Sequence, residues 1–94
     1  MKVLWSESAV RHLREVFSYV EGENAGAAVG LRRRILATAK RLGQMPLSGR
    51  VGRIQGTREA VVPRTPHIVA YEVEGDTVKI LGIWHGARLW PDAF

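Results

Sequence analysis

The sequence has no cysteine among its 94 residues. This absence excludes a disulfide scaffold and a thiolate-bound metal site, and it agrees with a reducing compartment. Long apolar runs are also missing. The N-terminus, MKVLWSESAV, lacks the apolar segment of a signal peptide, and no segment reaches the length of a membrane span. We therefore expect a cytoplasmic protein that does not enter a membrane.

Aromatic residues are few, at 7%, but apolar residues make up 46% of the chain and charged residues 24%. This composition is typical of a globular protein rather than a disordered one. A length of 94 residues suits one domain with one core and is too short for two. We expect a single domain over residues 1–94.

Acidic residues are nearly missing from the middle of the chain. From Arg32 to Arg64 the only acidic residue is Glu59, so this segment carries most of the positive charge of a chain whose net charge is +5. The basic residues of the segment are Arg32, Arg33, Arg34, Lys40, Arg41, Arg50, Arg53, Arg58 and Arg64. Such a segment suits an anionic partner, either a nucleic acid or an acidic protein segment, or it is simply hydrated.

Apolar spacing predicts two helices in the first half of the chain. A short strand over residues 2–5 precedes a helix over about residues 7–21, with Ser6 or Ser8 as its N-cap. Asn24 is placed to cap a second helix that runs to about Gln44. Two helices with so short a connection are expected to pack as an antiparallel hairpin. The predicted apolar stripes are Leu13, Val16, Phe17 and Val20 in the first helix, and Ala28, Leu31, Ile35, Ala39 and Leu42 in the second.

In the second half of the chain, β-rich runs separated by proline and turn residues predict strands. Pro46 prevents continuation of the second helix, and the Gly- and Arg-rich residues that follow indicate a loop leading into a sheet. We expect strands over residues 58–63, 67–73 and 77–85, the last two forming a hairpin around the turn residues EGD. The element order β-α-α-β-β-β indicates an α+β fold, with an N-terminal helical hairpin packed on a small, mainly antiparallel four-stranded sheet.

Residue spacing argues against several kinds of site. His12, His67 and His85 lie on three different predicted elements without ligand spacing, so neither a metal site nor a cofactor is expected. No serine stands in a nucleophile elbow. The segment GRVGRIQG lacks the lysine and hydroxyl of a phosphate-binding Walker loop.

Metal-independent cleavage of RNA is one chemistry that the remaining residues permit. It needs a base for the 2′-hydroxyl, an acid for the leaving oxygen, and cations for the phosphate. His85 is a candidate base or acid, and Arg58 and Arg88 are candidate phosphate ligands. Tyr71 is a candidate proton donor and Glu59 a candidate acceptor.

Each of these candidates also has a purely structural interpretation. Tyr71 also suits a core aromatic position, and Arg58 suits an ion pair on the sheet surface. The basic run over residues 32–34 suits a hydrated helix face, and the C-terminal tryptophans Trp84 and Trp90 suit core or lid positions.

Together these segments resemble the RelE/ParE superfamily of bacterial type II toxins over nearly the whole chain. The segments that carry the resemblance are LWSESAVRHLREVFSYV, SGRVGRIQGTRE, PHIVAYEV and VKILGIWHGAR. The resemblance implies two helices packed on a small antiparallel sheet. It also implies a partner: a cognate antitoxin, usually encoded beside the toxin, whose C-terminal segment wraps it in a tight complex that can be hetero-oligomeric. We expect an apolar cleft for this segment, between the helical hairpin and neighbouring elements or along the sheet edge.

The superfamily divides by target. RelE-like members cut messenger RNA on the ribosome, whereas ParE-like members inhibit DNA gyrase and so arrest growth. Ile68 stands where many RelE-like nucleases place an arginine, and no tyrosine follows Arg88. We therefore expect a gyrase inhibitor of the ParE type. The expected target-binding residues are Arg50, Arg53, Arg58, Tyr71, His85, Arg88 and Trp90.

Two alternatives remain. The first is a RelE-like, metal-independent endonuclease of ribosome-bound messenger RNA, with His85, Arg88 and Arg58 as its catalytic residues. The second is an interaction module that binds its antitoxin and takes part in DNA autoregulation without being toxic.

Overall fold

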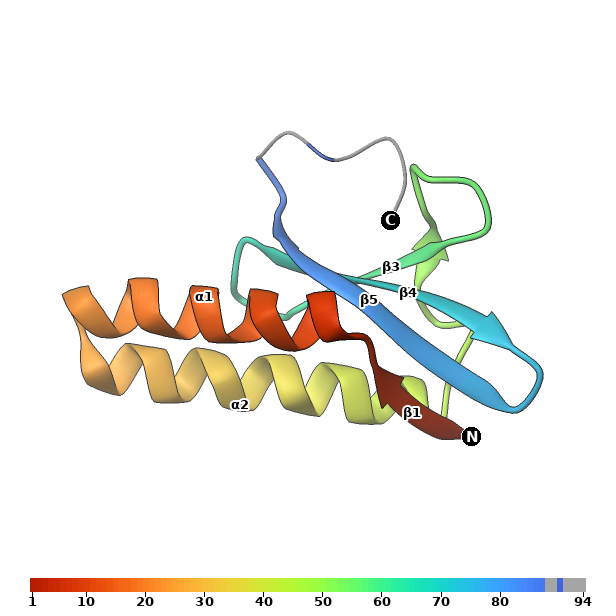
Figure 1. Ribbon diagram of the computed structural model, residues 1–94, viewed down its shortest axis with the longest axis horizontal. Helices are drawn as coiled ribbons and strands as arrows, with labels where there is room; N and C mark the ends of the chain where they lie inside the picture. Colours follow the sequence, from red (N-terminus) through yellow and green to blue (C-terminus); the bar gives the residue numbers. More distant parts are fainter. Residues whose placement is uncertain (88–89, 91–94) are drawn as a thin grey trace.

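The helices lie on one side of a mixed sheet, with the first strand leading directly into the helical hairpin (Figure 1). The structure, a computed structural model, describes residues 1–87 and 90. Its elements are β1 (Lys2–Trp5), α1 (Glu7–Glu23), α2 (Ala25–Leu42), β2 (Arg50–Val51), β3 (Arg58–Val61), β4 (His67–Glu74) and β5 (Thr77–His85). The predicted α+β class and the order of helices and strands are confirmed. None of the described helices is long and apolar enough to cross a membrane.

Both helices begin at the predicted caps. The N–H of Ala9 donates to Ser6 Oγ at 3.0 Å, and the N–H of Ala27 donates to Asn24 Oδ1 at 2.9 Å. The first helix runs to Glu23, beyond the predicted end, because the backbone leaves helical geometry only at Asn24, where φ is −160°.

The second helix ends at Leu42, earlier than predicted. The N–H of Gly43 bonds to the carbonyl of Lys40, and that of Gln44 bonds to the carbonyl of Arg41. Both bonds span three residues rather than four, which tightens the last turn and stops the α-helix before Pro46.

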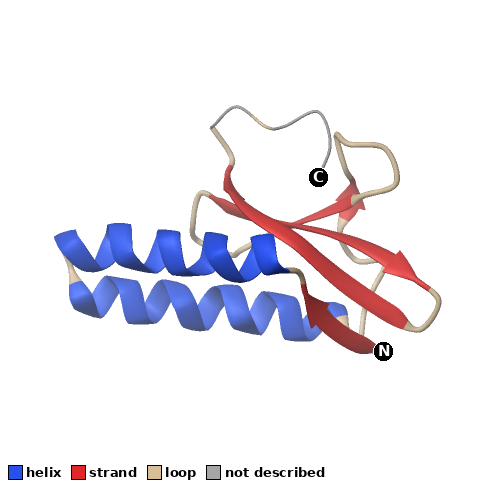
Figure 2. Ribbon diagram, viewed as in Figure 1, coloured by secondary structure: helices blue, strands red, loops and turns tan. Residues whose placement is uncertain are grey.

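The sheet has five strands rather than the four predicted, in the order β1-β5-β4-β3-β2 (Figure 2). The additional strand is β2, whose two residues pair antiparallel with Arg58 and Glu59 of β3. The hairpin of β4 and β5 is confirmed, and Gly75 in its turn has a φ of 59° that favours glycine. The first strand lies at the edge and pairs with β5 in parallel, which makes the sheet mixed.

The core forms where the predicted apolar stripe of α2 meets the sheet. Ile35, Ala39 and Leu42 are buried there, and Leu13 and Val16 of α1 pack against the same cluster. The sheet contributes Ala60, Val62, Val69, Tyr71, Val78, Ile80 and Ile83. The arginines at 32–34 are exposed, so they lie on a hydrated helix face.

The part of the β5 edge that has no strand beside it is hydrogen-bonded by α1 and its N-cap. Strand β1 pairs with β5 only over Thr77–Ile80, which leaves the residues after Ile80 without a neighbouring strand on that side. Ser6 Oγ donates to the carbonyl of Leu81 at 3.2 Å, and His12 Nδ1 accepts a hydrogen bond from the N–H of Ile83 at 3.2 Å. Gly82 permits this approach, because a Cβ atom there would lie 2.9 Å from His12 Nδ1.

This edge contact requires His12 to be neutral at Nδ1. Burial lowers the pKa of His12 below its ordinary value of 6.5, and nearby Glu15 offsets this only in part. The unfolded chain therefore takes up a proton at a higher pH than the folded chain. The contribution of His12 to stability is complete above about pH 6.5 and is lost as the pH falls through the lower pKa of the folded state.

We therefore expect the free energy of unfolding to fall between pH 7.5 and 5.5, and His12→Leu to reduce this pH dependence. At pH 7.5 the substitution should cost about 1–3 kcal/mol, because it leaves the N–H of Ile83 without an acceptor. Urea unfolding at the two pH values measures both effects. His85→Leu is the control, since His85 accepts its hydrogen bond from Ala87 in an exposed turn. Equal pH dependence in wild type and His12→Leu would contradict this account.

Candidate functional site

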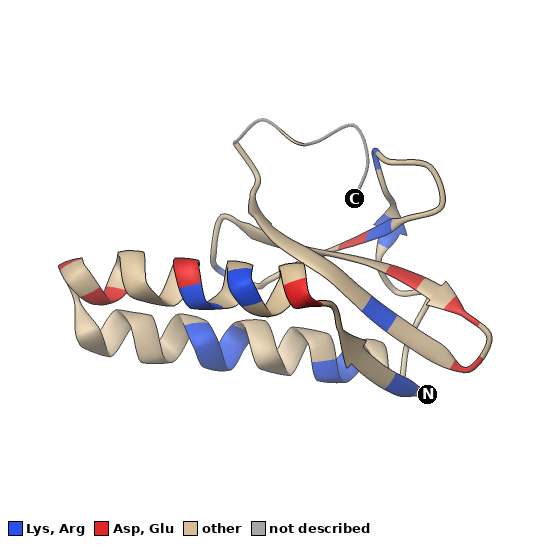
Figure 3. Cartoon of the chain, in the orientation of Figure 1, with Lys and Arg blue, Asp and Glu red and all other residues tan. Residues whose placement is uncertain are grey.

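The strand register divides the candidate residues between the two faces of the sheet. Residues directly opposite one another on neighbouring strands share a face. Arg58 is opposite Tyr71 and His85 is opposite His67, which places them on the face that packs on the helices. Arg50 is opposite Glu59, on the other face. Charge is divided as well, since basic residues follow α2 and the β2–β3 region while acidic ones lie mainly on α1 and the β4–β5 hairpin (Figure 3).

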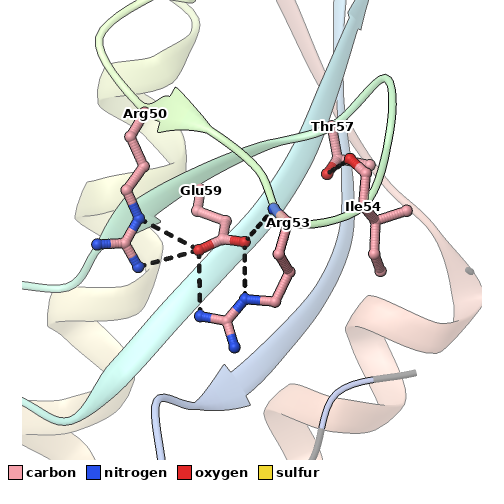
Figure 4. Close-up of polar contacts among 5 residues, drawn as sticks. All are labelled: Arg50, Arg53, Ile54, Thr57 and Glu59. Carbon is pink, nitrogen blue, oxygen red and sulfur yellow. Dashed lines mark hydrogen bonds and ion pairs between the residues drawn. The ribbon is translucent and has the colours of Figure 1, made fainter. Parts of the chain in front are cut away.

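A buried carboxylate organises the face away from the helices. The side chain of Glu59 is 2% exposed and accepts hydrogen bonds from both Arg50 and Arg53 (Figure 4). Its Oε1 accepts from Arg50 Nη2 at 2.9 Å and Arg50 Nε at 3.2 Å, and its Oε2 accepts from the Arg53 N–H at 2.9 Å and Arg53 Nε at 3.1 Å. The one acidic residue of the basic segment is therefore the shared counterion of two arginines.

These hydrogen bonds keep Glu59 ionised. Burial of the carboxyl group raises its pKa, but the backbone N–H of Arg53 and the two guanidinium groups lower it by more. The net effect is a pKa below the ordinary value of 4.5. Glu59 is thus an anion at neutral pH, and both of its oxygens are already occupied by arginine donors.

Two tryptophans extend this arrangement. The guanidinium carbon of Arg53 lies 3.8 Å from the ring centroid of Trp90, a cation–π contact. The Trp90 ring lies 5.8 Å from that of Trp84, with 36° between their planes. We call Arg50, Arg53, Glu59, Trp84 and Trp90 the outer array. The side chains of Arg50 and Arg53 are 55% and 42% exposed, so the array presents positive charge beside aromatic rings.

Tyr71 and Arg58 are occupied in holding a loop against the sheet. Tyr71 is fully buried, and its hydroxyl donates to the carbonyl of Pro46 at 2.8 Å and accepts from the N–H of Gly49 at 2.9 Å. Arg58 Nη1 donates to the carbonyl of Gly49 at 2.8 Å. The structure therefore places Tyr71 in the core and not on an exposed surface. This is the core aromatic position that the sequence also allowed for this residue.

The predicted apolar cleft is present between the helical hairpin and the far end of the sheet. It has a volume of about 600 Å³. One wall comes from the helices, and the other from the β3–β4 turn and the end of β5. The lining residues are His12, Glu15, Val16, Tyr19, Val20, Ala27, Leu31, Arg64, Thr65, Pro66, His67, Ile83, Trp84 and His85. We refer to this space as the cleft.

All three histidines of the sequence line the cleft, although they come from three different elements. The rings of His67 and His85 are 5.7 Å apart, and His85 Nδ1 accepts from the N–H of Ala87 at 3.1 Å. In the part of the chain that the structure describes, no group of three metal-ligating side chains is placed to hold a metal ion. Arg88, the other candidate from the same stretch, lies outside the described residues.

Sequence reasoning missed two features of these surfaces. The role of Glu59 as a shared counterion depends on arginines six and nine residues away whose side chains converge only through the β2–β3 pairing. Arg64 lines the cleft from a turn in which its φ is +61°. Its position between Pro63 and Pro66 was a signal for an unusual turn.

We expect Glu59→Gln to lower the free energy of unfolding at neutral pH by about 1–3 kcal/mol, because two half-exposed arginines lose their buried counterion. The loss should shrink as the pH falls below the ordinary value of 4.5 toward the lower folded pKa, since the wild-type carboxyl then also becomes protonated. Denaturant unfolding at several pH values measures this. The matched control is Glu74→Gln, at the exposed end of β4, with an expected change of at most about 0.5 kcal/mol. A loss at Glu59 no greater than at Glu74 would rule out the counterion role.

Comparison with known proteins identifies the family. Residues 3–90 match the family model described as "ParE toxin of type II toxin-antitoxin system, parDE". The chain is 37% identical over 90 residues to the protein named "Putative toxin Y4kP" of Sinorhizobium fredii (strain NBRC 101917 / NGR234), covering 96% of this chain and 93% of that protein. A chain of the solved structure "Chromosomal ParDE TA system from P. aeruginosa" has the same fold, with a TM-score of 0.81 at 23% identity over 88% of this chain and 92% of that one. The chain therefore belongs to the ParE toxins of type II toxin-antitoxin systems, within the RelE/ParE superfamily.

Proposed function

We propose that this toxin arrests growth by binding DNA gyrase through the outer array, and that it acts in the cytoplasm, where gyrase works. The observation that carries the proposal is the pair of exposed arginines Arg50 and Arg53, held in place by the buried Glu59, with the half-buried ring of Trp90 against Arg53. Aromatic and arginine side chains are the residue types that dominate the binding energy of protein interfaces. Because Glu59 fixes both arginines, they lose little conformational freedom when a partner binds.

The state of the candidate acid and base groups supports binding rather than RNA cleavage. The hydroxyl of Tyr71 and the carboxylate of Glu59 are both engaged in structural hydrogen bonds. Arg58 and His85 align with β4 residues four positions apart, an offset of about 13 Å along the strand. This backbone offset, together with the hydrogen bond that ties the Arg58 guanidinium to the carbonyl of Gly49, argues against a phosphate shared by Arg58 and His85.

The partner that neutralises the toxin follows from the family. A ParDE system implies a cognate ParD antitoxin. We place a segment of that antitoxin in the cleft, whose walls offer the half-buried side chains of Val16, Val20 and Leu31 to a ligand. An amphipathic peptide segment buries its apolar face in a groove of this kind. In this proposal the antitoxin and the target use opposite faces of the sheet.

Two assays run in parallel test the target. The purified toxin is added to a gyrase supercoiling reaction and to a purified translation system, in which primer extension detects messenger cleavage. We expect blocked supercoiling and intact messenger. Arg53→Ala should raise the toxin concentration needed for half-inhibition of gyrase about tenfold, the loss typical of an interface hot spot. Arg33→Ala, which removes an exposed charge on α2, should leave that concentration unchanged within about twofold.

The alternatives give different results in the same assays. Messenger cleavage at the ribosomal A site would overturn the gyrase proposal and assign His85, Arg88 and Arg58 to an endonuclease site. No effect in either assay, together with normal growth when the toxin is expressed alone, would leave the interaction-module interpretation. Circular dichroism and antitoxin binding confirm that Arg53→Ala is folded.

A further inference from the structure

The turn between β3 and β4 holds Arg64 in a backbone conformation that disfavours side chains. Its φ is +61°, and among residues 1–87 and 90 it is the one non-glycine residue with a positive φ. In this region the Cβ atom of an L-residue crowds the following carbonyl oxygen, a cost that glycine avoids. An arginine therefore occupies a position that glycine would fill with less strain.

The turn itself does not need the Arg64 side chain. The carbonyl of Val62 accepts from the N–H of Thr65 at 3.2 Å and from Thr65 Oγ1 at 2.9 Å, and Thr65 Oγ1 accepts from the N–H of His67 at 3.1 Å. These bonds and the two prolines that flank Arg64 and Thr65 fix the backbone conformation of the turn without any contact from the Arg64 side chain. Strain that persists in a turn so well determined points to a use for the side chain.

The surroundings of Arg64 suit the binding of an anion. The residue is exposed and lines the cleft, on the same wall as His67 and His85. Within the described residues no carboxylate lies at ion-pair distance from its guanidinium; the ion pairs there join Arg11 to Glu15 and Arg50 and Arg53 to Glu59. The cleft thus combines an apolar interior with an arginine at its rim that forms no ion pair within this part of the chain.

We propose that Arg64 binds a carboxylate of the antitoxin segment that fills the cleft. The segment carries apolar side chains that pack on Val16, Val20 and Leu31, and an acidic group placed to reach the rim, either an Asp or Glu side chain or its C-terminal carboxylate. The guanidinium donates two parallel hydrogen bonds to that carboxylate. Acidic Glu15 on the helical wall disfavours the reverse placement of the segment. This inference rests on the proposed docking of the antitoxin in the cleft.

Substitutions at Arg64 separate recognition from folding. We measure the affinity of the purified cognate antitoxin, the product of the gene beside this toxin, for wild type, Arg64→Gly and Arg64→Lys by calorimetry. Arg64→Gly should weaken binding about 10- to 100-fold, the loss of a charge-assisted bidentate contact. Its melting temperature should not fall, because glycine relieves the positive φ. Arg64→Lys keeps the positive charge but cannot donate two parallel hydrogen bonds. Its affinity for the antitoxin should therefore lie between those of wild type and Arg64→Gly.

A separate variant tests the docking proposal. Ala27 lines the cleft, and it is the third residue of α2, where glutamate is compatible with the Asn24 cap. Ala27→Glu therefore keeps the fold and places a charge among the apolar contacts, and we expect it to weaken antitoxin binding at least tenfold. Arg33→Ala, an exposed charge of α2 outside the cleft, controls for general electrostatic attraction.

The acidic group of the antitoxin is identified by a double-mutant cycle. Each Asp and Glu of the antitoxin segment is replaced by its amide, and its C-terminus is amidated, and each variant is measured against wild type and Arg64→Gly. One replacement should weaken binding to wild type about tenfold or more and have no further effect on Arg64→Gly.

Each outcome decides one of the two proposals. If Ala27→Glu weakens binding but Arg64→Gly binds as wild type does, or if no carboxylate couples to Arg64, the carboxylate contact is wrong and the docking site stands. If Ala27→Glu binds the antitoxin normally, the cleft is not its docking site. Self-association of the toxin that Ala27→Glu abolishes would assign the cleft to a second copy of this chain and overturn both.

Discussion

The open edge of β5 is the constraint on which the rest of the structure depends. A strand edge leaves N–H and carbonyl groups unpaired, and β1 is long enough to satisfy only the residues from Thr77 to Ile80. The remaining edge is satisfied by Ser6 and His12 of the first helix, so α1 must run alongside β5 and close to it. Gly82 makes this close approach possible. This contact places α1 against the sheet, while Ile35, Ala39 and Leu42 place α2 in the core between α1 and the strands.

The cleft is a consequence of the same placement. A helix of 17 residues is about 25 Å long, and only its first part is used on the strand edge. Its second part continues past the sheet, as Figure 1 shows. From this part Glu15, Val16, Tyr19 and Val20 line the cleft opposite the β3–β4 turn. The apolar side chains there belong to the same stripe that predicts the helix. They are half-buried because the sheet ends before it can cover them.

Local patterns predict the helices and the long hairpin, because their signals lie within a few residues. Ser6 and Asn24 cap helices whose apolar stripes have helical spacing, and Gly75 stands in a turn between two β-rich runs. The strand β2 has no such signal. Its two residues are exposed, and they pair with β3 because Arg50 reaches the carboxylate of Glu59 and because the loop before it is tied to Tyr71.

The candidate site is less predictable for the same reason. Sequence reasoning selected His85 and the arginines of the basic segment, but it treated them as one surface. The strand register places His85 and Arg58 on the helical face and Arg50 on the other. Which face a residue occupies depends on the pairing of β3, β4 and β5, and a bulge near Tyr71 shifts that pairing by one residue in the middle of the sheet. No local pattern encodes that shift.

Trp84 is the one side chain shared by the cleft and the outer array. It lines the cleft, its ring meets that of His12 at 4.7 Å, and it also packs against Trp90. The ring of Trp90 in turn makes a cation–π contact with the guanidinium of Arg53, which donates a hydrogen bond to Glu59. A continuous series of ring contacts therefore joins the cleft to the face of the sheet that carries Arg53.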